Sequence, residues 1–294
     1  MAYKTLFSVV TDIALANQVL DQAIAMAQAQ DAHLDVLCMG LDRTQTGFYY
    51  AGANAMILQE TITRAQEEAR EVEAYVKKIL TANDVRWSLD SGVSQLADMG
   101  RHVAQRARFS DLAILPQPYG VKRGVELEPI LEAAMFDGAT PVLMVPDGGS
   151  NVIAPKRILL AWNESDEALA AARTALPFLM QADSVRIVVI DPPAHSPTRS
   201  DPGGLLSQYL ARHGVNCEID VLSKTLPRVS DVLMRHAADT DSEMIVMGAY
   251  GHSRFREAIL GGATRNMLEN AKIPVFLAHR HGKGAAGPGL SRPS

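Results

Sequence analysis

The sequence predicts an α/β protein with two tandem doubly wound domains, each built on a five-stranded parallel sheet flanked by helices. Short, nearly continuous apolar runs alternate along the chain with longer segments whose apolar residues recur at helical spacing. Such apolar runs are typical of parallel strands that helices cover on both faces. The chain has 294 residues, enough for two domains with separate cores, and the element order of its first half recurs in its second half.

In the first half, five apolar runs are predicted to be strands and three segments with helical spacing are predicted to be helices. The longest of these helices carries Ala65, Ala69, Val72 and Val76 on one face. The predicted strands are residues 5–10, 34–39, 85–89, 112–115 and 142–145, and the predicted helices are residues 15–28, 55–80 and 96–107.

The second half follows the same order. Pro274 precedes its last apolar run, as Pro141 precedes the last apolar run of the first half. The segment 201–204, Asp-Pro-Gly-Gly, is predicted to be a loop because all of its residues favour turns. The predicted strands are residues 158–162, 185–190, 217–222, 244–247 and 275–278, and the predicted helices are residues 166–180, 229–238 and 255–270.

The turn-rich segment 146–150 marks a linker between the halves. We therefore expect one domain at residues 1–147 and a second at residues 154–281. The Gly-rich residues 282–294 lack the apolar side chains for a core and are predicted to be a flexible tail. Because the final strand of each half offers an edge for pairing, we expect the halves to form a pseudo-twofold monomer, or whole chains to form a homodimer.

The charge, the apolar stretches and the cysteines of the chain indicate which partners and which compartment to expect. The net charge is −5 with basic and acidic residues interspersed, which does not favour a nucleic-acid-binding surface. No apolar stretch approaches the roughly 20 residues that a membrane span needs. The two cysteines, Cys38 and Cys217, lie in predicted strands of different halves and are expected to be reduced, buried side chains. Reduced cysteines and the lack of a secretory signal favour a cytoplasmic protein.

A glycine pattern follows one predicted strand of the second half and occurs once in the chain. It runs Gly248-x2-Gly251-x9-Gly261, directly after Met247. Glycines at the end of a strand and the start of a helix allow backbone N–H groups to approach a phosphate closely. The pattern therefore predicts a nucleotide phosphate site, with turn and packing glycines as the alternative interpretation.

With this pattern before a helix and Ile273-Pro274-Val275 after it, the two halves resemble the universal stress protein family, and in particular its tandem members. The resemblance implies a stress-response protein that binds ATP or another adenine nucleotide in its second domain, with Mg²⁺ as an accompanying ion. Carried over position by position, it implies that the nucleotide is bound by Asn163, Val189, Met247, Gly248, Gly251, Gly261, Gly262 and Ala263.

Two positions depart from the pattern of the family. The last glycine is usually followed by Ser or Thr, but here by Gly262, and one hydroxyl hydrogen bond is worth about 0.5–1.5 kcal/mol. The first strand usually ends in Asp, but here Asn163 follows it, which is a poorer ligand for a divalent cation. We therefore expect binding to be weaker than usual and hydrolysis to be disfavoured.

The first half departs further from the family. Pro116 stands where the second half has Gly248, and a proline lacks the N–H donor and adds bulk. The later segment 136–140 has no matching pair of glycines, although Asp12 remains after the first strand. We expect the first half to have lost its nucleotide site.

Three functions are compatible with these features. The first is a regulatory module, not an enzyme, that binds an adenine nucleotide. The second is a stress-linked protein-interaction module of the same fold that binds no nucleotide. The third, a weak ATP hydrolase or nucleotidyl transferase, is the least favoured because no general base or metal-holding carboxylate occupies the matched positions. Motifs of standard nucleoside triphosphatases, dehydrogenases and zinc hydrolases are absent from the sequence.

Overall fold

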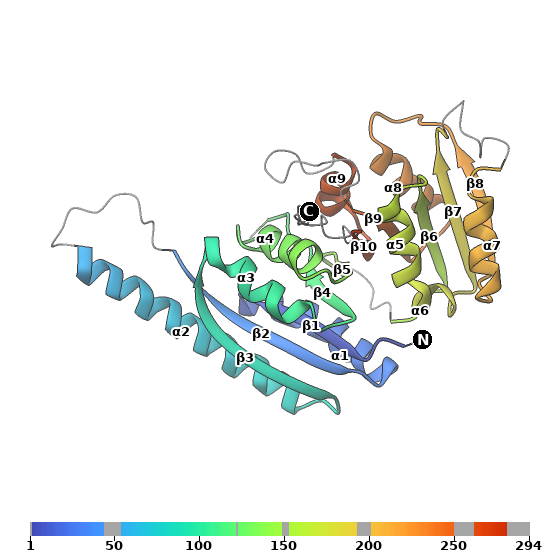
Figure 1. Ribbon diagram of the computed structural model, residues 1–294. Coiled ribbons are helices and arrows are strands. Elements are labelled where there is room, and N and C mark those ends of the chain that lie inside the picture. Colours follow the sequence, from blue (N-terminus) through green and yellow to red (C-terminus); the bar gives the residue numbers. More distant parts are fainter. Residues whose placement is uncertain are drawn as a thin grey trace, which may run out of the picture.

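The computed structural model describes residues 2–43, 54–121, 123–148, 153–192, 201–249 and 262–280, without the side chains of 54–58. Within these ranges, helices and strands alternate along both halves of the chain (Figure 1). The first half contains β1 (Thr5–Val10), α1 (Ile13–Gln30), β2 (His33–Asp42), α2 (Asn54–Thr81), β3 (Arg86–Gln95), α3 (Leu96–Ala107), β4 (Leu112–Pro116), α4 (Leu127–Glu132), the π-helix η1 (Ala133–Asp137) and β5 (Val142–Val145). The second half contains β6 (Arg157–Trp162), α5 (Asp166–Thr174), α6 (Leu176–Leu179), β7 (Ser184–Ile190), α7 (Gly204–Arg212), β8 (Cys217–Leu222), α8 (Val229–Asp239), β9 (Met244–Gly248), α9 (Gly262–Asn270) and β10 (Val275–Ala278).

All ten strands form one sheet in the order β3-β2-β1-β4-β5-β10-β9-β6-β7-β8. Strands are parallel within each half, whereas β5 and β10 are antiparallel, with Leu143 opposite Phe276. The strand order is therefore the same in each half, counted outward from the junction. This confirms the predicted fold class and the predicted pairing of the two final strands.

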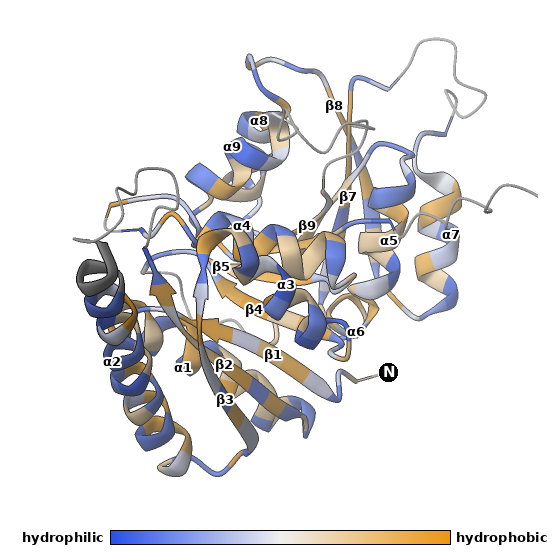
Figure 2. Ribbon diagram, turned by 60° about the vertical axis from the view of Figure 1, so that its left-hand side comes forward, coloured by the Kyte–Doolittle hydropathy of each residue, from blue (hydrophilic) through white to orange (hydrophobic). Residues whose placement is uncertain are grey.

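The core has two layers, one on each face of the sheet. One apolar cluster packs beneath α1, α2, α5, α6 and α7, and the other beneath α3, α4, α8 and α9. Each cluster contains residues of both halves. Figure 2 shows the strands largely orange, while the outer surface of α2 is largely blue. Polar contacts also join the halves, since Tyr3 Oη donates to the Thr174 carbonyl at 2.7 Å and Gln117 Nε2 to the Leu268 carbonyl at 2.8 Å.

Both cysteines are free thiols. Cys38 is fully buried, as expected, and burial, reinforced by the Glu73 carboxylate, raises the pKa of its thiol to about 12. Cys217 is half-buried, so the prediction of full burial is wrong for this residue. Its place in β8, the edge strand of the sheet, accounts for the difference, because an edge strand has no neighbour on one side.

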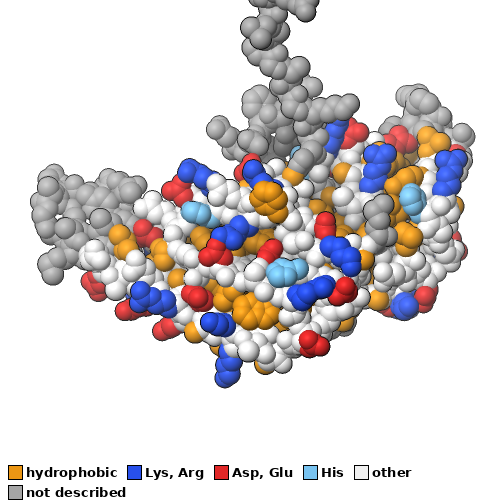
Figure 3. Space-filling view, turned by 60° about the horizontal axis from the view of Figure 1, so that its bottom comes forward, with side chains coloured by type: hydrophobic (Ala, Val, Ile, Leu, Met, Phe, Trp, Pro, Cys, Tyr) orange, Lys and Arg blue, Asp and Glu red, His pale blue; other side chains and the backbone are white. Residues whose placement is uncertain are grey.

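The outer surface of the described protein is mixed in charge. On the face in Figure 3, basic and acidic side chains are interspersed, and apolar side chains form only small groups. Among the described helices, none is both long and apolar enough to pass through a bilayer.

Two helical segments differ from the sequence-based expectation. Helix α7 was not predicted, and it begins at Gly204, the last residue of the predicted loop 201–204. Gly203, just before it, has a positive φ of 91°. Residues 166–180 form two helices, α5 and α6, because Pro177 occupies the first turn of α6 and cannot donate to a continuing helix. Of the predicted helix at 255–270, the part from Gly262 is helical and residues 255–261 lie outside the described ranges.

The structure also contains two helices, α4 and η1, that the apolar pattern of the sequence did not predict, and they lie between β4 and β5. They pack against α3, and Ile130, Leu131 and Met135 are buried there. Strand β3 is longer than the predicted 85–89 because it extends alongside β2 as far as the pair Asp42 and Gln95.

Candidate functional site

A cavity of about 330 Å³ lies at the carboxyl ends of β6 and β9. In the sheet, β6 lies between β7, which follows it along the chain, and β9. The strand order therefore reverses between β6 and β9. Ligands of doubly wound sheets bind at such points. The cavity is lined by Ala161, Trp162, Asn163, Ala168, Val188, Ile190, Val229, Leu233, Met247, Gly248, Gly262, Ala263 and Thr264.

Five of the eight residues singled out from the sequence line this cavity: Asn163, Met247, Gly248, Gly262 and Ala263. Gly251 and Gly261 lie outside the described residues. Val189 is not among the lining residues, although its neighbours Val188 and Ile190 are, and the prediction for Val189 concerns its backbone. Side chains alternate along a strand, so Val188 and Ile190 face the cavity and Val189 is buried on the other face of β7.

An apolar wall forms one side of the cavity, and the glycine pattern gave no indication of it. Val188 and Ile190 contribute from β7, and Val229 and Leu233 from the first turns of α8. The two-residue spacing in a strand and the four-residue spacing in a helix are the signals that could have identified this wall. Trp162, the last residue of β6, also lines the cavity, although its side chain packs with the core cluster of the opposite face.

Asn163 occupies a tight turn between β6 and α5. Its Oδ1 accepts a hydrogen bond from the Ser165 backbone N–H at 3.2 Å, and Glu164 between them has a positive φ of 62°. Ser165 then caps α5 by accepting from the Ala168 N–H at 3.1 Å. The carbonyl oxygen of Asn163 is therefore engaged in the turn, and its amide nitrogen is the group with which it can donate to a ligand.

Gly248 has a packing role that is independent of any ligand. An ideal Cβ at this position would lie 2.5 Å from the Ala168 backbone nitrogen and 2.6 Å from the Glu167 carbonyl carbon. The first turn of α5 can thus approach β9 only where the strand has no side chain. For this glycine, the geometry agrees with the packing interpretation.

Gly262 is different, because an ideal Cβ there would meet no atom of the described residues within 4 Å. It is the first residue of α9, and Ala263 and the buried Thr264 follow it along the cavity. Backbone N–H groups in the first turn of a helix have no partner within the helix and favour anions. The start of α9 therefore gives the cavity a polar, weakly electropositive end opposite its apolar wall.

A buried side-chain network fixes α9 against α8. The amide nitrogen of Asn266 donates to Ser230 Oγ and to Asp231 Oδ1, both at 2.7 Å. Arg228 in turn donates to Asn266 Oδ1. Because Val229 lies between Arg228 and Ser230, the network holds the apolar wall and the start of α9 in one arrangement.

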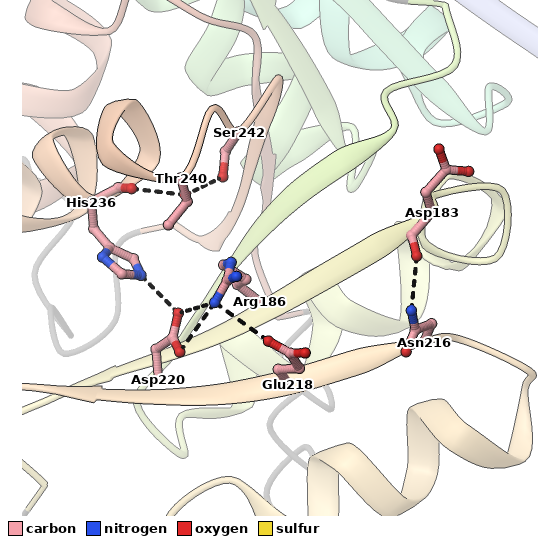
Figure 4. Close-up of polar contacts among 8 residues, drawn as sticks. All are labelled: Asp183, Arg186, Asn216, Glu218, Asp220, His236, Thr240 and Ser242. Carbon is pink, nitrogen blue, oxygen red and sulfur yellow. Dashed lines mark hydrogen bonds and ion pairs between the residues drawn. The ribbon is translucent and has the colours of Figure 1, made fainter.

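A second polar network secures α8 to the sheet on the same face (Figure 4). Asp220 of β8 lies 2.8 Å from His236 of α8 and 3.1 Å from Arg186 of β7. Burial alone raises the pKa of the Asp220 carboxyl, but hydrogen bonds from His236 and Arg186 outweigh it and hold the pKa below its usual value. The described residues contain no group of three or more His, Cys, Asp or Glu side chains placed to hold a metal ion.

The first half has no comparable crevice between β1 and β4. Its strand register places Pro116 where the second half has Gly248, since Leu6 pairs with Leu112 as Ile158 pairs with Met244. The space there, lined by Pro116 together with Leu15 and Leu127, is about 10 Å³. That volume is about one water molecule, so the crevice has no room for a nucleotide.

The sequence of the second half matches a known family. Residues 155–279 match the model of the universal stress protein family. The chain is also 27% identical over 129 residues to the universal stress protein Slr1230 of Synechocystis sp., and the match covers 41% of each chain. The match thus spans less than half of the length of this curated relative.

Two solved structures share the fold over nearly the whole chain. A universal stress protein from Archaeoglobus fulgidus superposes with a TM-score of 0.64 at 14% identity, covering 94% of this chain and 98% of that one. A protein from Pseudomonas aeruginosa UCBPP-PA14, solved as a candidate universal stress protein, gives a TM-score of 0.60 at 14% identity, covering 95% and 94%. At 14% identity these matches show a shared fold only, and the shared fold extends over both halves of the chain.

Proposed function

We propose that this chain, whose residues 155–279 match the model of the universal stress protein family, is a stress-response regulatory module that binds an adenine nucleotide at the carboxyl ends of β6 and β9. The observation that carries the proposal is the two-part lining of this cavity. An apolar wall stands on one side and the start of α9 on the other. Its volume of about 330 Å³ lies within the range of ligand pockets.

Each part of the lining suits one part of a nucleotide. Val188, Ile190 and Leu233 offer apolar contact to a base, which is flat and weakly hydrated. The first N–H groups of α9, at Gly262 and Ala263, suit phosphate oxygens. Asn163 lies at the same cavity and can donate to a ribose hydroxyl or a phosphate. We expect Mg²⁺, where present, to accompany the phosphates, because Asn163 is not a carboxylate.

We propose that the nucleotide is a signal and is not consumed. None of the described residues lining the cavity has an acidic, basic or thiol side chain. General acid–base chemistry needs such a group within hydrogen-bond reach of the reacting atoms. A ligand held there would contact both the start of α9 and the residues that α8 contributes to the wall.

An interaction module that binds no nucleotide is the second candidate. Gly248 favours it, because the close approach of Ala168 accounts for this glycine without any phosphate. Gly262, which lacks the hydroxyl usual for the family, favours it as well.

Calorimetric titration with ATP, ADP and AMP separates the two candidates. Gly262→Val is the informative variant, because a Cβ there meets no atom of the described residues, while the added side chain narrows the cavity. Gly92→Val is its control, since Gly92 lies in β3 with similarly open surroundings. We expect wild type and Gly92→Val to bind with equal affinity and Gly262→Val to bind at least tenfold more weakly. Absence of binding to any of the three nucleotides at millimolar concentration would reject the nucleotide proposal and leave the interaction module.

A further inference from the structure

The first half contains a larger cavity than the second, in a different place. It has a volume of about 430 Å³ and lies beside the closed crevice, between the end of β1, the start of α1, the end of β2 and α2. Ile13 and Val72 in its lining pack with the core cluster of α1 and α2. The cavity at β6 and β9 is lined by residues of the other cluster, such as Val188 and Leu233. The two cavities share no lining residue.

The side chain of Arg123 lines this cavity and is only 3% exposed. One of its terminal nitrogens, Nη2, pairs with Asp147. Its Nε and Nη1 are buried and have no hydrogen-bond partner among the described residues. A buried guanidinium with unsatisfied donors is costly, because it has lost water without gaining acceptors. These donors point to a ligand that carries an anionic oxygen.

Carboxylates dominate the rest of the lining. Asp12, Glu68, Glu71 and Glu126 line the cavity, against two arginines, Arg43 and Arg123, so its formal charge is −4 + 2 = −2. Such a lining repels a polyphosphate but attracts a group with positive charge.

The acidic lining is held in place by specific contacts. Glu126 is 6% exposed, and its Oε1 accepts a hydrogen bond from Thr11 Oγ1 at 3.0 Å. Its carboxylate also lies over Gly124, where an ideal Cβ would be 2.1 Å from Oε1. On the other side, Arg43 pairs with Glu68 at 3.0 Å. The side chain of Glu71 is exposed at the mouth of the cavity.

We propose that this cavity binds a free amino acid, with its carboxylate on Arg123 and its ammonium group among the carboxylates. A zwitterion satisfies the unpartnered guanidinium donors and places positive charge in the acidic part of the same space. The excess of two negative charges favours lysine or arginine, whose side chains carry a second cation. The site is independent of the nucleotide cavity, since the two cavities have no lining residue in common.

Calorimetric titration of the full chain with L-lysine and L-arginine tests the proposal. Acetate, which lacks the amine, and cadaverine, which lacks the carboxylate, are the ligand controls. We expect both amino acids to bind at least tenfold more tightly than either control. Failure of both to bind a folded wild-type protein, or equal binding of cadaverine, would overturn the proposal.

Two variants assign the contacts. Arg123→Met keeps an unbranched apolar stem but removes the donors, and we expect at least a tenfold loss of lysine affinity. Its unfolding temperature without ligand separates binding from structure: loss of the ion pair with Asp147, which is 58% exposed, is offset by relief of two buried, unpartnered donors, so we expect little change. Glu71→Gln, at an exposed position, is expected to fold normally and to reduce the affinity for lysine more than the affinity for glycine. Arg101→Met, an exposed arginine of α3, is the matched control and should bind like wild type. Unchanged lysine affinity in either cavity variant would contradict the assignment.

Discussion

His236 Nε2 of helix α8 lies 2.8 Å from Asp220 Oδ2 of the edge strand β8. Arg186 of β7 approaches the same carboxylate, so one anion joins two strands and a helix. Because Val229 and Leu233 of α8 form part of the apolar cavity wall, this anion also stabilises one side of the candidate nucleotide site.

Asp220→Asn is expected to lower the free energy of unfolding by about 1–3 kcal/mol at neutral pH, because a neutral amide is a weaker acceptor than a carboxylate for Arg186 and His236. The native pKa of Asp220 lies below its usual value. Its charge therefore stabilises the protein fully above about pH 4, the pKa range of an unfolded Asp, and this contribution is lost as pH falls through the native pKa. Urea unfolding at pH 7, 5 and 3.5 should show the difference between wild type and variant shrinking toward acid.

Glu218→Gln is the control for this network. Glu218 is 71% exposed and pairs with the same arginine at 3.5 Å, so its removal should change stability by less than about 1 kcal/mol. An equal effect of the two substitutions, or a constant deficit of Asp220→Asn at all three pH values, would show that the buried contacts to His236 carry no special weight.

Gly248→Ala is expected to destabilise the protein by about 1–3 kcal/mol, since its Cβ would overlap the backbone of Ala168 and force α5 away from β9. Gly262→Ala should have little effect, because a Cβ there meets no neighbour in the part of the chain that the structure describes. Denaturant unfolding of both variants measures the difference. Wild-type stability of Gly248→Ala would refute the packing role of this glycine.

Asn163→Asp is expected to make ATP binding depend on Mg²⁺. A carboxylate can still accept the Ser165 N–H and preserve the turn, but it adds a negative charge beside the phosphates. In EDTA we expect about tenfold weaker binding than wild type, or about 1.4 kcal/mol, and recovery in millimolar Mg²⁺. Identical ATP affinity of variant and wild type in both buffers would place the phosphates away from residue 163.

Phe276→Ala tests the continuity of the sheet at the junction of the halves. Phe276 of β10 is fully buried, and its ring meets that of Phe178 edge-on at 6.0 Å. We expect a loss of about 3–5 kcal/mol. Phe109→Ala, at a residue 79% exposed, should cost less than about 0.5 kcal/mol. Similar stability of these two variants would contradict the assigned core.

The sequence predicted buried strands better than edges and short helices. Strands such as β5 and β10 are uniformly apolar and buried, so their bounds follow directly from the pattern. The edge strand β3 alternates exposed and half-buried residues, and only its pairing with β2 reveals its full length. Helix α7 was missed because its nine residues bury few side chains, Leu206 and Leu210 among them, and follow turn-forming residues.

The site was predictable where a strand end defined it. Asn163 and Gly248 follow or end neighbouring strands, so topology brings them together. For the apolar wall, local spacing indicates which residues of β7 share a face and which residues of α8 do, but it does not indicate that the two faces meet at one cavity. The cavity around Arg123 is a similar case, since it forms between segments far apart in the sequence.

A crystal structure of the protein grown with ADP tests the central claim most directly. The proposal predicts electron density for the adenine against Val188 and Leu233, with phosphates at the N–H groups of Gly262 and Ala263. Density for ADP elsewhere on the molecule, or an empty cavity at a nucleotide concentration that saturates binding in solution, would contradict it.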